Sequence, residues 1–167
     1  MAERKGATTP LPAFAVDKML GRLARWLRIL GHDVCWGPEL RGRALAARAR
    51  REHRLLLTRD TRLVRERNLP PHLFVTSDHF REQLRQVAAV VPLGGGFLHR
   101  CVACNMAVVP TSRDAAVPRV PPYVLATQER FHECPRCRRV YWSATHRDRI
   151  LEELARIGLA PAAEGSA

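Results

Sequence analysis

The sequence of 167 residues contains no apolar run as long as the ~18 residues that a membrane-spanning helix requires. Its first residues, MAERKGATTPLP, lack the apolar core of a secretory signal peptide. These absences argue against a membrane protein and a secreted protein, so we expect a cytoplasmic protein with no membrane partner. Disulfides are rare in that reducing compartment, and the five cysteines therefore need another role.

Acidic residues are scarce in this chain. It has 16 aspartates and glutamates against 28 lysines and arginines, which gives a formal net charge of +12 and a pI near 11.0. Such a field attracts polyanions, and nucleic acid is the leading candidate. The alternative is a charge that serves solubility in a genome that favours arginine. A hydrophobic content of 46% is ordinary for a globular protein, and the length fits one domain with or without a small module.

Strand and helix patterns alternate over residues 13–98. Short apolar runs predict strands at 13–16, 33–36, 55–58 and 72–76, and helical spacing predicts helices at 18–30, 40–51, shortly after 60, and 79–90. The strands are continuous apolar runs, which is typical of a parallel sheet covered by helices on both faces. We therefore expect an α/β fold for this half.

An acidic residue follows each predicted strand: Asp17, Glu39, Asp60 (in LLLTRD) and Asp78. The carboxyl ends of parallel strands share one edge of the sheet, where ligands bind. Clustered carboxylates repel one another unless a cation lies between them, and oxygen ligands suit Mg²⁺ or Mn²⁺. The alternative for Asp17 and Asp60 is a structural one, because each precedes a predicted helix and could act as its N-cap.

Two CxxC motifs mark the second half of the chain: Cys101 and Cys104 in CVAC, and Cys134 and Cys137 in CPRC. Two such motifs complete a tetrahedral Cys₄ zinc site. The spacer exceeds the usual ~15–20 residues, which leaves room for strands and a proline-rich loop (VPRVPPY) between the motifs. A closed Cys₄ site has no open position for a substrate, so we expect a structural zinc that supplies folding energy to a small module. A redox role for either motif is the weaker alternative. The fifth cysteine, Cys35, is expected to be a core residue.

These patterns divide the chain into four expected segments. They are a flexible lead-in (1–12), an α/β domain (13–98), a zinc ribbon (99–150), and a short helix with a loose tail (151–167).

Four segments, FAVDKMLGRLARWLRILGHDV, LLLTRD, RCVACN and CPRCRRVYWSATHRDRI, together resemble the mut-seven C-terminal RNase family over roughly residues 13–150. The resemblance implies a PIN-like three-layer α/β/α sandwich with a parallel sheet, followed by a small Cys₄ zinc ribbon. It also implies metal-dependent hydrolysis of RNA phosphodiester bonds. Asp17 and Asp60 match the acidic site of the family, and Glu39 stands where the family tends to have an aspartate. YWSATHRD lacks the family's glycine after Trp142 but keeps the position of His146.

The expected function is that of a divalent-metal-dependent ribonuclease acting on single-stranded RNA, with the zinc ribbon helping to hold the RNA. Asp17 and Asp60 would hold Mg²⁺ or Mn²⁺, with Glu39 and Asp78 as further catalytic acids. The expected substrate contacts, which position phosphates without reading sequence, are Lys18, Arg22, Arg25, Arg59 and His146. The alternative is a non-catalytic, zinc-stapled RNA-binding protein with a degenerate acidic site. Tyr141 and Trp142 could stack on bases, but packing over the zinc knuckle is the favoured interpretation.

Overall fold

The computed structural model describes residues 11–94, 96–142 and 144–159, and the side chains of all of these except 144–147. Its first half contains a four-stranded sheet in the order β2-β1-β3-β4, and all three strand pairings are parallel. The strands are Phe14–Val16 (β1), Val34–Cys35 (β2), Leu55–Thr58 (β3) and His72–Phe74 (β4). The predicted parallel sheet is therefore confirmed.

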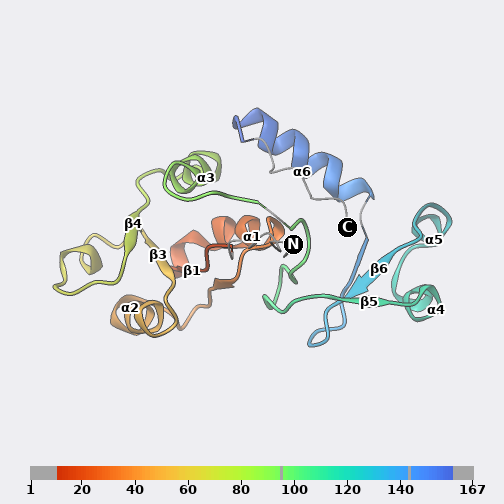
Figure 1. Cartoon of the computed structure of the whole chain (residues 1–167), viewed down its shortest axis with the longest axis horizontal. Coiled ribbons are helices and arrows are strands. Elements are labelled where there is room, and N and C mark those ends of the chain that lie inside the picture. Colours follow the sequence, from red (N-terminus) through yellow and green to blue (C-terminus); the bar gives the residue numbers. More distant parts are fainter. Residues whose placement is uncertain (1–10, 95, 143, 160–167) are drawn as a thin grey trace, which may run out of the picture.

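Helices cover both faces of this sheet (Figure 1). On one face lie α1 (Gly21–Ile29) and α3 (Phe80–Ala88), and on the other lies α2 (Gly42–Arg51). Along β3, Leu57 packs into the core beneath α1 and α3, whereas Leu56 packs beneath α2. Burial on both faces explains why the strands are continuous apolar runs. The arrangement is the expected three-layer α/β/α sandwich.

The last helix of the chain returns to the first half. Helix α6 (Ala144–Arg156) contributes Ile150 and Leu154 to the same core cluster as α1 and α3, and Ile157 follows in the next turn. Figure 1 shows α6 running from the second half toward α3, and Arg85 of α3 donates a hydrogen bond to the carbonyl oxygen of Ile157. None of the helices in the described part of the chain is both long enough and apolar enough to cross a bilayer.

The second half is a three-stranded antiparallel sheet, formed by Val109–Thr111 (β5), Phe131–Glu133 (β6) and Val140–Trp142 (β7). Between β5 and β6 lie α4 (Arg113–Ala116), a 3₁₀ turn (Val117–Arg119) and α5 (Pro122–Thr127). The sequence had indicated an irregular proline-rich loop there, which is wrong. The backbone N–H groups in the first turn of a helix have no partner within the helix, so a proline, which lacks this group, is tolerated there. Prolines of the 3₁₀ turn and of α5 occupy such first-turn positions.

A buried arginine joins the two halves. Arg28 on α1 is only 3% exposed, and it donates hydrogen bonds to the carbonyl oxygen of Val34 (2.9 Å) in β2. It also donates to the carbonyl oxygens of Val102 (3.1 Å) and Ala103 (3.0 Å) in the first CxxC turn. The side chain of Asn105 completes the junction, because its Oδ1 accepts a hydrogen bond from the Val34 amide at 2.9 Å. The first cysteine turn is therefore fastened to the edge of the parallel sheet.

We expect Arg28→Met to lower the free energy of unfolding by about 3 kcal/mol. The substitution leaves buried carbonyl oxygens without donors, and each such loss costs about 1–3 kcal/mol. Chemical denaturation measures the effect, and Arg50→Met on the exposed surface of α2 is the matched control. A loss no larger than that of the control would show that Arg28 does not fasten the halves together.

A buried histidine makes the stability of the fold depend on pH. The ring of His32 is fully buried, with Nδ1 2.9 Å from the carbonyl oxygen of Pro12 and Nε2 accepting a hydrogen bond from the Gly94 amide at 3.2 Å. The ring is therefore neutral, with its proton on Nδ1. Burial lowers the pKa of His32 below its ordinary value, although the hydrogen bond to Pro12 opposes this shift.

The stability that His32 contributes is therefore present above about pH 6.5 and is lost as the pH falls toward its lowered pKa. Below about pH 6.5 the unfolded chain binds a proton that the folded chain does not, so the free energy of unfolding should decrease by up to about 1.4 kcal/mol per pH unit. Denaturation at several pH values measures this slope. His32→Gln should make the slope shallower, and an unchanged slope would contradict the assignment.

Candidate active site and zinc centre

The first acid, Asp17, lies buried at the carboxyl end of the interior strand β1. Its backbone N–H donates to the carbonyl oxygen of Leu57 at 2.9 Å, which continues the pairing of β1 with β3. The residue is 2% exposed. Its Oδ2 accepts a hydrogen bond from the Thr58 hydroxyl at 2.8 Å, and its Oδ1 accepts a longer one, 3.4 Å, from the Met19 amide. The capping role, which was the alternative to metal binding, is therefore present, but the hydrogen bond is long.

Thr58 connects the first acid to the third. Its hydroxyl donates to Asp17 and accepts a hydrogen bond from the backbone N–H of Asp60 at 3.0 Å. Thr58 is fully buried as the last residue of β3, so its rotamer is held by the surrounding core. No role for Thr58 was predicted from the sequence. The available signal was a polar side chain at the end of an otherwise apolar strand.

The carboxylate of Asp60 also caps the turn that follows it. Oδ1 accepts hydrogen bonds from the amides of Arg62 (2.8 Å) and Leu63 (3.2 Å). Oδ2 makes no hydrogen bond with a described residue. An ionised carboxylate offers about four acceptor positions, so capping through Oδ1 leaves Oδ2 available to another ligand.

The other two acids lie in different surroundings. Glu39 is exposed in the loop after β2, where its carboxylate lies against Gly37: a Cβ added at that glycine would be only 2.6 Å from Oε1. Asp78 is exposed after β4 and forms an ion pair with Arg59. The hydrogen bond and the positive charge of Arg59 lower the pKa of Asp78. Arg59 therefore already has an acidic partner.

The structure thus links the carboxylate of Asp17 to the backbone N–H of Asp60 through one hydroxyl group, and it does not gather all four acids. Among the described residues, no three carboxylates come close enough to form a ready-made metal cage. Mg²⁺ usually keeps several waters and is held by one or two protein carboxylates together with substrate phosphates. The Asp17–Asp60 pair fits that form of site.

The predicted basic residues of the first helix are exposed near these acids. Lys18, Arg22 and Arg25 all lie at the surface, and the guanidinium of Arg22 lies over the ring of Phe80, 3.8 Å from its centroid. The side chain of His146, another predicted contact, lies outside the described residues.

The four cysteines of the CxxC motifs form a compact cluster. Their Sγ atoms all lie within 4.8 Å of one another, and the shortest separations are 3.2 Å (Cys104 to Cys134), 3.3 Å (Cys104 to Cys101) and 3.5 Å (Cys101 to Cys137). None of the four forms a disulfide. A zinc tetrahedron with Zn–S bonds of ~2.3 Å has S···S edges of ~3.8 Å, so only a small expansion is needed. The cluster is arranged to bind zinc.

The electrostatics of the cluster also suit a cation. Burial disfavours the Cys101 thiolate, but hydrogen bonds from Tyr141 and from the Cys104 amide and thiol lower the pKa of Cys101 to about 6. Burial and the neighbouring sulfurs raise the pKa of Cys104 to about 12. The cluster therefore stabilises one thiolate, at Cys101, and disfavours a second negative charge at Cys104. A bound divalent cation would offset this repulsion, since a thiol that coordinates such a cation is deprotonated.

Tyr141 packs on the cysteine cluster, as the favoured interpretation expected. Its hydroxyl donates to Sγ of Cys101 at 3.0 Å and accepts a hydrogen bond from the Val102 amide at 3.2 Å. Burial, together with the bond to Cys101, raises the pKa of Tyr141. The fifth cysteine, Cys35, is buried in β2, as expected.

Of three comparisons with known proteins, one gives a match. No curated protein and no solved structure matches the chain significantly. The family model described as the Mut7-C RNAse domain matches residues 12–154, which spans the parallel sheet, both cysteine motifs and most of α6. The chain therefore belongs to the Mut7-C RNAse domain family.

Proposed function

We propose that this protein is a divalent-metal-dependent ribonuclease that hydrolyses phosphodiester bonds of single-stranded RNA. The observation that carries the proposal is that Asp17 and Asp60 follow adjacent parallel strands, where the Thr58 hydroxyl bonds both the Asp17 carboxylate and the Asp60 backbone N–H. Membership of an RNase domain family and a net charge of +12 support RNA as the substrate.

In this proposal each acid has a distinct task. Asp17 and Asp60 hold the metal, and the buried hydroxyl of Thr58 keeps the carboxylate of Asp17 in one orientation. A bound Mg²⁺ or Mn²⁺ would supply an activated water and neutralise charge on the scissile phosphate. Glu39 and Asp78 are the further acids of this edge, where they can contact the metal's waters.

The basic residues at this edge hold the substrate. Lys18, Arg22 and Arg25 contact phosphates, which positions the RNA without reading its sequence. Arg59 contributes positive charge while it is held by Asp78. His146 is a further proposed phosphate contact. The zinc, closed in by four cysteines, has a structural role.

A second candidate function is that of a non-catalytic RNA-binding protein. It is favoured by the hydrogen bonds that Oδ1 of Asp17 and Oδ1 of Asp60 accept from following backbone amides. It is also favoured by the absence of a three-carboxylate cluster among the described residues. In that case both acids act only as helix caps.

The metal requirement tests the proposal. Zinc-loaded protein is incubated with a labelled single-stranded RNA in buffer without added divalent ions, and then with Mg²⁺ or Mn²⁺. We expect cleavage only after Mg²⁺ or Mn²⁺ is added, and slower cleavage of the same RNA in a duplex. Equal cleavage with and without the added ions would contradict a divalent-metal mechanism.

A further inference from the structure

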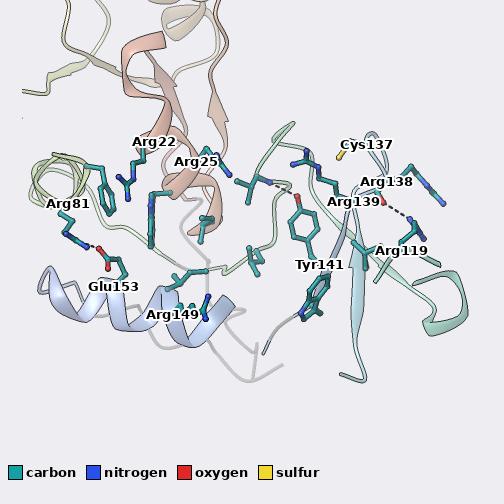
Figure 2. Close-up of a pocket in the computed structure, with 18 residues that line it drawn as sticks. Arg22, Arg25, Arg81, Arg119, Cys137, Arg138, Arg139, Tyr141, Arg149 and Glu153 are labelled. Atoms are coloured by element: carbon teal, nitrogen blue, oxygen red, sulfur yellow. Dashed lines mark hydrogen bonds and ion pairs between the residues drawn. The ribbon is translucent and has the colours of Figure 1, made fainter. Parts of the chain in front are cut away.

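A cleft of about 890 Å³ lies between the two halves of the molecule. Its walls come from α1 and α3 on one side, from the second cysteine turn and β7 on another, and from α6 (Figure 2). Its lining includes seven arginines and a single acidic residue, Glu153. These arginines come from segments far apart in the sequence: Arg22, Arg25, Arg81, Arg119, Arg138, Arg139 and Arg149.

Much of this positive charge has no internal partner. Glu153 already forms ion pairs with Arg81 and with Arg156, which lies outside the cleft. Arg119 and Arg138 share Glu133, the last residue of β6. The remaining four cleft arginines make no ion pair with a described residue: Arg22, Arg25, Arg139 and Arg149. Like charges gathered in a concave wall repel one another and raise the local concentration of anions. The cleft therefore favours a polyanionic occupant.

Aromatic side chains are interleaved with the arginines. Trp26 and Trp142 line the cleft and are partly exposed, and Tyr141 also lines it, with its hydroxyl held at the cysteine cluster. Trp26 stacks on Phe80, with ring centroids 5.6 Å apart and planes 23° from parallel, and this packing holds the indole in place. Arginines that contact phosphates beside aromatic rings that stack on bases are the elements of single-strand binding sites. An acidic peptide would use the arginines but not the aromatic rings.

The cleft leads to the edge of the sheet that carries the acids. A smaller hollow, of about 460 Å³, is lined by Met19, Asp78 and their neighbours. It shares Arg22, Phe80 and Arg81 with the large cleft. Met19 follows Asp17 by two residues and donates a hydrogen bond to it. A strand that passes along the shared wall therefore reaches Met19 and Asp78, two residues of chain away from Asp17 on the side of Met19.

We propose that this arginine cleft binds the stretch of single-stranded RNA next to the scissile bond. Arg22 and Arg25 of α1 form one wall, and the ribbon's Arg139 and α6's Arg149 form the other. The zinc ribbon is then part of the substrate site, since its metal positions Arg138 and Arg139 directly after Cys137. The inference rests on the proposed function, because it assigns the substrate path of that same acidic edge.

Charge reversal on both walls tests the cleft. The double variant Arg25→Glu with Arg149→Glu is compared with Arg50→Glu with Arg67→Glu, which makes the same change in net charge at exposed positions outside the cleft. Binding of a fluorescent single-stranded RNA to the zinc-loaded full chain is followed by anisotropy without Mg²⁺ or Mn²⁺. We expect the cleft variant to lose at least about tenfold in affinity at ~0.1 M salt. A plot of its log binding constant against log salt concentration should be shallower by about 1.4, because two phosphate contacts are lost. The control should change by less than about threefold.

The outcomes separate this inference from the ribonuclease proposal. If the cleft variant loses binding while the wild type never cuts RNA, the cleft assignment stands and the proposed catalysis fails. If the wild type cuts RNA and the cleft variant binds and cuts like its control, the cleft assignment is overturned and the ribonuclease stands. Failure of the wild type to bind RNA at all would also overturn it. Should the charge reversal disturb folding by circular dichroism, Arg25→Ala with Arg149→Ala replaces it, with a loss of affinity again expected.

Discussion

Replacing Asp17 with asparagine is expected to lower the rate of RNA cleavage by about 10²–10³-fold. Asparagine removes the negative charge that holds the metal, and metal stabilisation of charge in the transition state contributes several kcal/mol. Each 1.36 kcal/mol corresponds to about a tenfold change in rate. Single-turnover cleavage of a labelled RNA with Mn²⁺ measures the effect.

The fold should survive this substitution, so a loss of cleavage would report the loss of a metal ligand and not unfolding. The amide oxygen of asparagine can still accept the hydrogen bond that Thr58 donates to Asp17 at 2.8 Å. RNA binding without divalent ions should therefore stay close to that of the wild type. Asp114→Asn, an exposed change in α4, is the matched control and should cleave normally. Normal cleavage by the Asp17→Asn protein would remove Asp17 from the site.

Replacing Cys134 with serine is expected to release zinc and unfold the ribbon. Cys134 is fully buried, and structural zinc supplies an apparent binding free energy of about 10–16 kcal/mol in small modules. The ribbon has only a small core of its own, formed by Ala116, Val120, Val124 and Phe131. That core is too small to replace the metal.

Unfolding should stop at the parallel sheet. Asp17, Thr58 and Asp60 belong to a half whose core lies mainly between the sheet and α1, α2 and α3, with α6 added from beyond the ribbon. That half should be weakened, because Arg28 and Asn105 lose their contacts across the junction. Amide hydrogen exchange by segment and zinc content measure the result, with Cys35→Ala as the control that keeps the metal. Stoichiometric zinc and unchanged protection of the ribbon in the Cys134→Ser protein would contradict the structural role.

The sheet could be predicted because its signals are local. Strands buried on both faces are continuous apolar runs, and Leu55–Thr58 appears in the structure with the bounds that the sequence indicated. The role of Arg28 could not be predicted, because its bond to Val102 spans 74 positions and nothing local separates it from the other arginines. The short helices between β5 and β6 were missed for a different reason. Prolines suggest a loop, although they are tolerated in the first turn of a helix.

The candidate site was only partly visible in the sequence. Counting an acid after each strand places four carboxylates at one edge, but it does not show how far each loop carries its acid from the strand. Asp17 follows β1 directly and meets Thr58, whereas Asp78 lies beyond Val75, Thr76 and Ser77, where it meets Arg59. The cleft could not be predicted from the sequence either. Its arginines lie far apart in the chain, and they come together only when the ribbon and α6 pack against the first half.

The most direct test compares wild type and Asp60→Asn in one experiment that measures both binding and cleavage of a labelled single-stranded RNA with Mn²⁺ or Mg²⁺. We expect both proteins to bind the RNA and only the wild type to cut it, because Asp60 is proposed to hold the metal together with Asp17. If the wild type binds the RNA and never cuts it, the central claim is wrong. The protein would then be an RNA-binding module in which Asp60 is only a helix cap.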